Sequence, residues 1–196
     1  LPKIWNCHVG LNSQRMEVNS PFKTNGYLTF GSFNNFCKIN DVVINTWSKI
    51  LKKINNSKLI LKPSGRSDIS RLKKCFQNNK VLDSVIFYEN IQSVDDHLKL
   101  YNKIDIALDT FPYNGVTTSF EAIWMGAPIL TMKGFNFNSR CGESINYNIG
   151  LPELIAKNED DYIDKAVELS KNIDQLIFIR KKIFEKALSS PLFDTK

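Results

Sequence analysis

The chain has 196 residues, of which 42% are hydrophobic and 23% are charged. This composition is typical of a globular domain and excludes a disordered or collagen-like chain. Lys and Arg outnumber Asp and Glu by 26 to 20, which gives a net charge of +6. The charge favours anionic ligands, but the scattered lysines do not indicate a nucleic-acid partner. No apolar run is long enough to predict a membrane span.

The predicted elements alternate between strand and helix. Residues 1–25 lack regular periodicity and predict an irregular arm or linker, followed by one domain over residues 26–196. The predicted strands are 27–33, 58–62, 85–88, 104–108, 129–131 and 154–156. The predicted helices are 42–54 (capped by Asp41), 67–78, 95–102, 118–125, 139–148, 160–171 and 174–187.

This alternation predicts an α/β fold, a Rossmann-like parallel sheet with helices on both faces. Right-handed crossovers place the carboxyl ends of all the strands at one edge, where such sheets bind ligands. The loops at that edge are 33–40, 63–67, 88–96, 109–118 and 132–140. The chain has neither G-x-x-x-x-G-K-S/T nor a G-x-G-x-x-G after a strand, which disfavours a P-loop enzyme or a conventional NAD enzyme.

The four cysteines are far apart in the sequence, and none forms a C-x-x-C pair. We therefore expect no metal site. Such thiols are typical of a reducing compartment, so the sequence predicts a cytoplasmic protein with mostly buried cysteines. The first residues have no initiator Met and no features of a signal peptide, so we expect the chain to be a fragment of a longer protein.

The loop after the fourth predicted strand, residues 109–118, is the most informative segment. Gly115 permits a tight turn or the close approach of a ligand. Thr117 or Thr118 can cap the next helix, whose N–H groups and dipole would then bind a phosphate. The alternative is a capped helix start with nothing bound.

Four further polar residues lie near the same edge. Lys38 supplies a mobile charge suited to a diphosphate, and Asn35 can donate to the same oxygens, although lysines are more often solvated surface residues. His97 can stack on a base, but a histidine on a helix is more often simply packed or exposed. Glu121 can accept hydrogen bonds from a ribose, or it only complements the helix dipole.

Four segments carry a resemblance to a known family. They are GYLTFGSFNN with the following KI (26–39), LDTFPYNGVTTSFEAIWMGAPILTM (108–132), ELIAKN (153–158) and SSPLFDTK (189–196). They resemble the C-terminal catalytic lobe of O-linked N-acetylglucosamine transferases, closer to the bacterial members with tetratricopeptide repeats. The resemblance implies the donor-binding lobe of an inverting, metal-independent GT-B glycosyltransferase. The resemblance also implies that such an enzyme uses no cofactor. The enzyme is expected to transfer a sugar, N-acetylglucosamine, from its UDP-sugar to a hydroxyl of a protein acceptor.

The resemblance also assigns roles to the residues expected near the phosphates. Lys38 matches the lysine on the diphosphate and is the expected catalytic residue. Asn35 stands where the animal enzyme has a phosphate-contacting glutamine. Thr117 and Thr118 match the pair at the start of the phosphate-binding helix. Val116 departs from the family, which has a histidine beside that pair.

The nucleoside contacts follow in the same way. His97 matches a histidine that packs on the uridine, Gln92 matches a backbone position that pairs with uracil, and Glu121 stands for the ribose-binding carboxylate. Val94 and Leu100 replace a lysine and an arginine of the family near the nucleoside.

The resemblance places the general base and most acceptor contacts, whether to protein or glycan, on an N-terminal lobe and repeats outside this segment. The chain alone is therefore expected to bind UDP but to transfer little or no sugar. The alternative is a non-catalytic module that binds a nucleotide or a partner protein. A third reading is a relative of the nucleotide-sugar epimerases, since fold alone does not choose among these functions.

Overall fold

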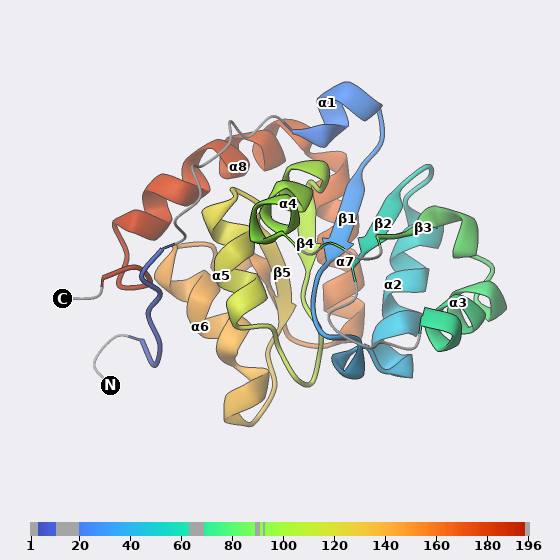
Figure 1. The fold of residues 1–196 in the computed structure, drawn as a ribbon, viewed down its shortest axis with the longest axis horizontal. Helices are drawn as coiled ribbons and strands as arrows, with labels where there is room; N and C mark the ends of the chain where they lie inside the picture. Colours follow the sequence, from blue (N-terminus) through green and yellow to red (C-terminus); the bar gives the residue numbers. More distant parts are fainter. Residues whose placement is uncertain (1–3, 11–19, 63–68, 89–90, 92, 195–196) are drawn as a thin grey trace.

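The computed structural model describes residues 4–10, 20–62, 69–88, 91 and 93–194, and in these residues six parallel strands form one sheet (Figure 1). The strands are β1 (Thr29–Ser32), β2 (Lys58–Leu61), β3 (Val85–Phe87), β4 (Ile106–Leu108), β5 (Ile129–Met132) and β6 (Ile155–Ala156). Their order is β3-β2-β1-β4-β5-β6, and every neighbouring pair is parallel. The order reverses between β1 and β4, which is where such sheets bind ligands.

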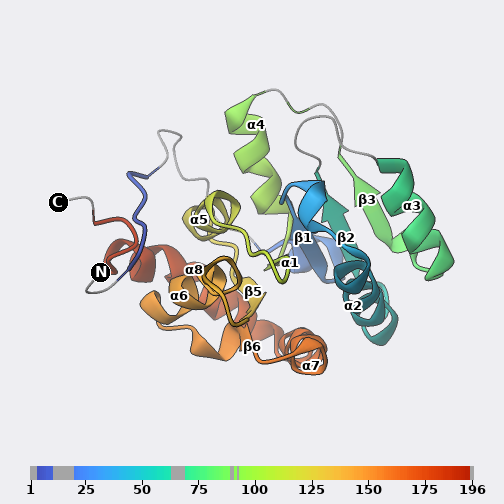
Figure 2. The same cartoon turned by 90° about the horizontal axis from the view of Figure 1, so that it is seen from below.

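Helices cover both faces of this sheet. The α-helices are α1 (Pro21–Asn25), α2 (Asp41–Lys53), α3 (Ile69–Asn78), α4 (Val94–Lys99), α5 (Thr117–Trp124), α6 (Cys141–Asn148), α7 (Glu159–Lys171) and α8 (Ile173–Leu188). The short 3-10 helices are η1 (Phe36–Lys38), η2 (Leu82–Ser84), η3 (Leu100–Lys103), η4 (Phe137–Ser139) and η5 (Pro152–Leu154). Figure 2 shows α4 and α5 on one side of the sheet and α2 and α7 on the other. The predicted fold class is confirmed.

The predicted elements occur in the predicted order, with three local differences. Asn40 caps α2 by accepting the Val43 N–H. The prediction that Asp41 is the cap is therefore wrong, and Asp41 is the first residue of the helix. Pro21–Asn25 are helical within the segment expected to be irregular, because Pro suits a helix start and Gly26, at φ 73°, ends it. The predicted helices 95–102 and 139–148 each divide into a 3-10 turn and an α-helix.

The central strands are buried on both faces, as the short apolar strand sequences predicted. Phe30 on β1 and Leu59 on β2 are fully buried, and Trp47 of α2 and Phe120 of α5 pack into the core from their helices. β3 and β6 are the edge strands, and Ile86 of β3 is partly exposed. No described helix has the length and apolar content that a membrane crossing needs.

A buried polar network closes the amino-terminal edge of the sheet. Arg180 of α8 donates from Nη1 to the carbonyl oxygens of Ile104 and Asp105, at 2.8 and 2.9 Å. The Asp105 carboxylate accepts the Ser20 hydroxyl at 2.8 Å and the Thr29 N–H at 2.9 Å. This network ties α8 and the residue before α1 to the amino-terminal ends of β1 and β4.

The cysteines differ from expectation in one respect. All four are free thiols, but Cys7 and Cys37 are exposed, Cys75 is half-buried and only Cys141 is buried. The expectation of mostly buried cysteines is therefore wrong. The reason is their position, because Cys7 lies on the N-terminal segment and Cys37 on a short turn, outside the packed faces of the sheet.

Candidate functional site

The Lys38 side chain crosses from the end of β1 to the loop after β4. Its Nζ donates to the Asn114 carbonyl oxygen at 2.9 Å and lies 4.3 Å from the centre of the Tyr113 ring. Partial burial lowers the pKa of Lys38, and the nearby Asp109 carboxylate opposes that shift. The predicted proximity of Lys38 to the loop after the fourth strand is confirmed, and it brings an ammonium group to the switch point of the sheet.

Two other predicted phosphate or base contacts are less defined. Asn35 is exposed, and its Oδ1 accepts the Cys37 N–H at 3.0 Å, so it caps the turn that carries Lys38. Gln92 lies outside the described residues. The structure therefore gives Asn35 a local structural task and leaves its phosphate contact as a prediction.

The surroundings of Gly115 leave no room for a side chain. Its N–H donates to Asp109 Oδ1 at 2.7 Å. A Cβ at this position would lie 2.6 Å from Thr118 Oγ1, 2.8 Å from Asn34 Oδ1 and 3.0 Å from Ser119 Oγ. The absence of a side chain at Gly115 therefore lets the loop pack against the start of α5, and the close approach of a ligand stays a prediction.

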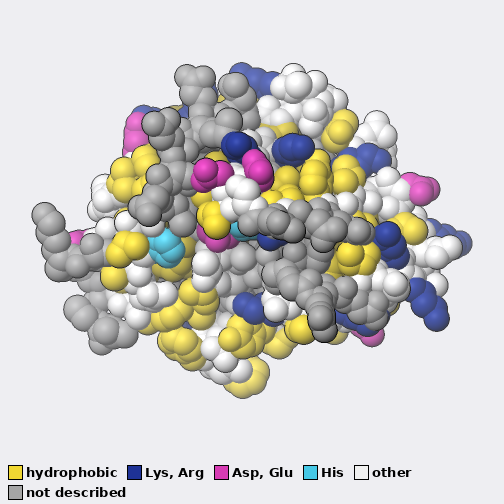
Figure 3. All heavy atoms as spheres, viewed as in Figure 1, with side chains coloured by type: hydrophobic (Ala, Val, Ile, Leu, Met, Phe, Trp, Pro, Cys, Tyr) yellow, Lys and Arg dark blue, Asp and Glu magenta, His cyan; other side chains and the backbone are white. Residues whose placement is uncertain are grey.

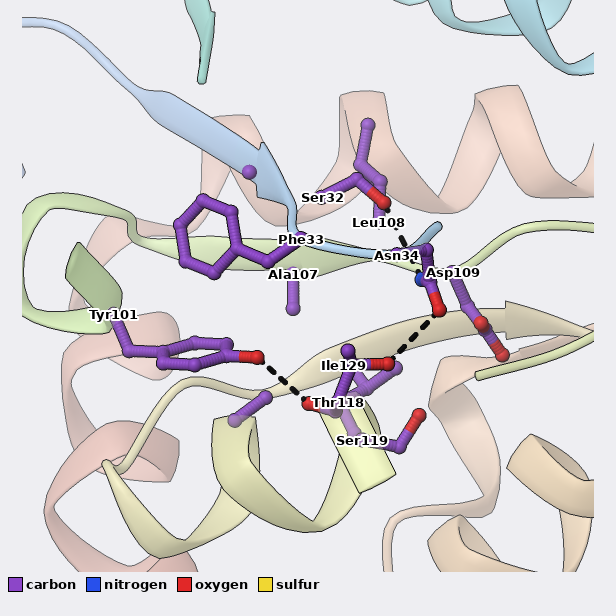
Figure 4. A pocket seen from close by; sticks show the side chains of 12 residues that line it. Ser32, Phe33, Asn34, Tyr101, Ala107, Leu108, Asp109, Thr118, Ser119 and Ile129 are labelled. Carbon is purple, nitrogen blue, oxygen red and sulfur yellow. Dashed lines mark hydrogen bonds between the residues drawn. The ribbon is translucent and has the colours of Figure 1, made fainter. Parts of the chain in front are cut away.

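The start of α5 has no side-chain cap. Val116 occupies the cap position, Thr117 is the first helical residue and exposed, and neither threonine caps the helix, so that prediction is wrong. The Thr118 hydroxyl donates instead to Asn34 Oδ1 at 2.9 Å (Figure 4). The first N–H groups of a helix have no intrahelical acceptor, so those of Thr117 and Thr118 can serve an anion.

His97 and Glu121 lie together beside this helix start. His97 Nε2 is 3.0 Å from Glu121 Oε2, and each side chain is 14% exposed. The same oxygen accepts the Tyr101 hydroxyl at 3.0 Å. The His97 ring also contacts Phe33 edge-on, with the ring centres 5.9 Å apart. Tyr101 was missed in the sequence, where it is one tyrosine among six.

A narrow cleft opens between the ends of β1 and β4 and the start of α5, with a cavity volume of about 10 Å³. Figure 4 shows that the Asn34, Asp109 and Thr118 side chains meet at one end and Phe33 and Tyr101 lie at the other. Pockets for whole small molecules usually enclose about 300–1,000 Å³. A ligand as large as a nucleotide would therefore lie across the mouth of this cleft.

Two buried residues of the loop after β4 were not predicted as site residues. Asp109 and Asn114 are 2% and 0% exposed. Burial raises the pKa of Asp109 to about 6, while hydrogen bonds from Gly115, Thr131 and Thr110 oppose the rise. The signal available in the sequence was a polar residue that ends the otherwise apolar run IALD, at the ligand edge.

Hydrophobic side chains gather along the lower edge of the face in Figure 3, over the loops that follow β4 and β5. Three aromatic residues of these loops are exposed: Phe135 at 92%, Phe137 at 60% and Tyr113 at 48%. Exposed apolar groups gathered at one place are typical of an interaction surface. Among the described residues, no group of three or more His, Cys, Asp or Glu side chains is placed to hold a metal ion.

Residues 16–196 match glycosyl transferase family 41. SPINDLY of Eustoma exaltatum subsp. russellianum, described as a probable UDP-N-acetylglucosamine–peptide N-acetylglucosaminyltransferase, is 35% identical over 201 residues. That match covers 99% of this chain and 22% of the relative. The UDP-N-acetylglucosamine–peptide N-acetylglucosaminyltransferase of Caenorhabditis elegans is 32% identical over 169 residues, 86% of this chain and 15% of the relative. The chain thus spans less than a quarter of the length of these curated relatives.

Solved structures agree on the fold. A mutant of Thermobaculum terrenum O-GlcNAc transferase superposes with a TM-score of 0.79 and 32% identity, over 87% of this chain and 33% of that one. The glycosyltransferase WaaG superposes with a TM-score of 0.64 at 14% identity, over 88% of this chain and 47% of that one, which bears on the fold alone. The sheet is thus that of a GT-B lobe, and the chain belongs to glycosyl transferase family 41.

Proposed function

We propose that this chain is the donor-binding lobe of an inverting, metal-independent transferase. It moves N-acetylglucosamine from UDP-N-acetylglucosamine to a hydroxyl of a protein acceptor. One observation carries the proposal: Lys38 Nζ is held 2.9 Å from the Asn114 carbonyl, beside the uncapped start of α5, at the switch point of the sheet. The names of the relatives support both the donor and the acceptor class.

The diphosphate binds between Lys38 and the start of α5 in this proposal. Negative charge develops on UDP as the bond to the sugar breaks. The Lys38 ammonium and the N–H groups of Thr117 and Thr118 stabilise that charge without a metal, and Asn35 contributes a further donor. Losing one such donor typically costs about 10²–10³ in rate.

The uridine packs on His97, and its ribose hydroxyls donate to Glu121. The low exposure of both side chains supports a fixed platform rather than two mobile surface groups. The backbone of Gln92 pairs with the uracil in the same proposal. Val94, which replaces a charged residue of the family, is exposed and makes this nucleoside edge less polar, whereas Leu100 is buried in the core.

Acceptor binding and the general base belong to parts of the protein outside this chain. The proposal includes an N-terminal lobe and tetratricopeptide repeats, a bacterial source and a cytoplasmic location. The exposed Phe135, Phe137 and Tyr113 offer a surface for contact with that lobe. The four free thiols support a reducing compartment.

Calorimetric titration of UDP into the chain tests the proposal. We expect binding by the wild type, and at least about tenfold weaker binding for Lys38→Ala, because a charge-assisted contact is lost. Thr117→Ala loses a hydroxyl at the helix start and is expected to weaken binding less. Lys23→Ala is the matched control, because Lys23 is an exposed lysine on α1, far from the carboxyl edge. Unchanged affinity in both Lys38→Ala and Thr117→Ala would contradict the site.

The reaction itself is tested on the longer protein. Radiolabelled UDP-N-acetylglucosamine and a peptide acceptor should give labelled peptide, whereas this chain alone should bind UDP with little or no transfer. Binding without turnover in the longer protein would favour a non-catalytic module. Free UDP together with an epimerised sugar would indicate an epimerase.

A further inference from the structure

The Asp109 carboxylate joins three separate parts of the ligand edge. Its Oδ1 accepts the N–H groups of Thr110 and Gly115 at 2.9 and 2.7 Å, and its Oδ2 accepts the Thr131 hydroxyl of β5 at 2.7 Å. A Cβ on Gly142, near the start of α6, would lie 2.7 Å from the same Oδ2. The absence of a side chain at Gly142 therefore lets α6 approach the carboxylate closely.

Asn114 extends this hydrogen-bond network from Asp109 to Lys38. Its Nδ2 donates to the Thr110 carbonyl at 2.9 Å, and its Oδ1 accepts the Gly142 N–H at 3.3 Å. Its own carbonyl oxygen receives the Lys38 ammonium at 2.9 Å. The position of that ammonium thus depends on a loop whose two ends are both bound to Asp109.

We propose that Asp109 is a positioning residue for the donor diphosphate, fixing loop 110–115 so that Lys38 and the start of α5 face the same anion. The inference rests on the proposed function, which supplies that anion. Asp109 lies beneath the loop and acts through the Gly115 N–H and the Asn114 carbonyl. Preorganised donors of this kind stabilise charge at no cost of reorganisation during the reaction.

The carboxylate also places a buried negative charge beneath the anion site. Three titratable groups from other elements interact with it: Lys38 of η1, Cys141 of α6 and Tyr162 of α7, and Lys38 is the cation among them. A bound diphosphate is negative, so it raises the pKa of Asp109 above its value of about 6 in the free chain. Binding then takes up a proton, and the affinity increases as the pH falls from 8 toward 6.

Two substitutions distinguish the hydrogen bonds that Asp109 accepts from the negative charge that it carries. Asp109→Ala leaves buried donors unpaired and should weaken UDP-N-acetylglucosamine binding by about tenfold or more. Asp109→Asn should stay within about threefold at pH 7.5, because its amide oxygen accepts from Gly115 and its NH₂ donates to the Thr131 hydroxyl. The wild type should bind more tightly at pH 6 than at pH 8, and this dependence should be weaker in Asp109→Asn. The phosphates of a UDP-sugar carry no group that titrates in this range, so the ligand adds no dependence of its own.

Calorimetry at pH 6, 7.5 and 8, with circular dichroism to verify folding, decides the matter. Folded Asp109→Ala that binds like the wild type overturns the inference and leaves the proposed function intact. A wild type that does not bind the UDP-sugar overturns both. If Asp109→Ala does not fold, Asp109→Asn decides alone: a pH profile equal to that of the wild type overturns the inference, and a weaker pH dependence supports it.

Discussion

His97 Nε2 and Glu121 Oε2 lie 3.0 Å apart although the two residues come from α4 and α5, on opposite sides of β4 in the sequence. Glu121 also accepts the Tyr101 hydroxyl, so one carboxylate orients two rings. Among the described residues, His97 Nδ1 is buried without a hydrogen-bond partner, which leaves the bond to Glu121 as the one that orients the imidazole. A base packed on His97 would therefore depend on Glu121 as well.

Glu121→Ala should weaken UDP binding and lower the free energy of unfolding by about 1–3 kcal/mol, because the Tyr101 hydroxyl loses its carboxylate acceptor and His97 loses its orienting partner. Glu121→Gln keeps an acceptor oxygen and should lose less of both quantities. Calorimetry and chemical denaturation measure the two effects. Glu121→Ala with the affinity of the wild type would contradict the ribose contact and the orientation of His97 together.

Gly115→Ala should weaken UDP binding, because its Cβ would lie 2.6 Å from Thr118 Oγ1 and 2.8 Å from Asn34 Oδ1 and so separate that pair. Gly26→Ala is the control. Gly26 has a φ of 73° with no atom within 4 Å of an added Cβ, so the substitution costs about 1 kcal/mol of backbone strain away from the site. We expect Gly26→Ala to lower the melting temperature and leave UDP affinity unchanged. Equal affinities for both variants would show that close packing at Gly115 is unimportant for binding.

Arg180→Met should lower the free energy of unfolding by about 2–4 kcal/mol without changing UDP affinity. Arg180 is 1% exposed, and the variant leaves the carbonyl oxygens of Ile104 and Asp105 without their donor. Burial lowers the pKa of Arg180 to about 10, so the group is charged at neutral pH. Denaturant titration measures the loss, and a large change in UDP affinity would argue against separate edges for stability and binding.

Asp109 makes stability depend on pH in a direction that can be calculated. Burial raises its pKa in the folded chain from 3.8 to about 6, so the folded state binds the proton more tightly than the unfolded state. The free energy of unfolding therefore decreases as the pH rises from about 4 to 6, by up to about 3 kcal/mol. Asp109→Asn has no such contribution.

The matched measurement is denaturation of the wild type and Asp109→Asn at pH 4.5 and pH 7. The unfolding free energy of the variant minus that of the wild type should increase by about 2 kcal/mol between these pH values, because the unfolded carboxyl is already largely ionised at pH 4.5. A difference that stays constant would mean that Asp109 has the same pKa in the folded and unfolded chains.

The sequence predicted the layers of the fold and the edge that carries the loops. Hydrophobic periodicity distinguishes short apolar strands from amphipathic helices, and right-handed crossovers then place all the strand ends together. That placement made Lys38 and the loop after the fourth strand candidates, and the family resemblance then assigned the lysine to the diphosphate. The assigned caps were wrong at Asp41 and at the Thr117–Thr118 pair, because capping depends on one residue of local geometry and periodicity locates a helix end only to within a few residues.

Sequence order thus determined the parallel sheet and its ligand edge, and the family resemblance singled out the candidate lysine. Tertiary structure decided what each polar side chain does there. In the folded chain the Thr118 hydroxyl donates to Asn34, and His97 lies within hydrogen-bonding distance of Glu121. Asp109 accepts the Gly115 N–H of the loop whose Asn114 carbonyl accepts from Lys38. These partners are 84, 24, 6 and 76 residues apart in the chain, and except within the loop itself only the packed sheet brings them within hydrogen-bonding distance.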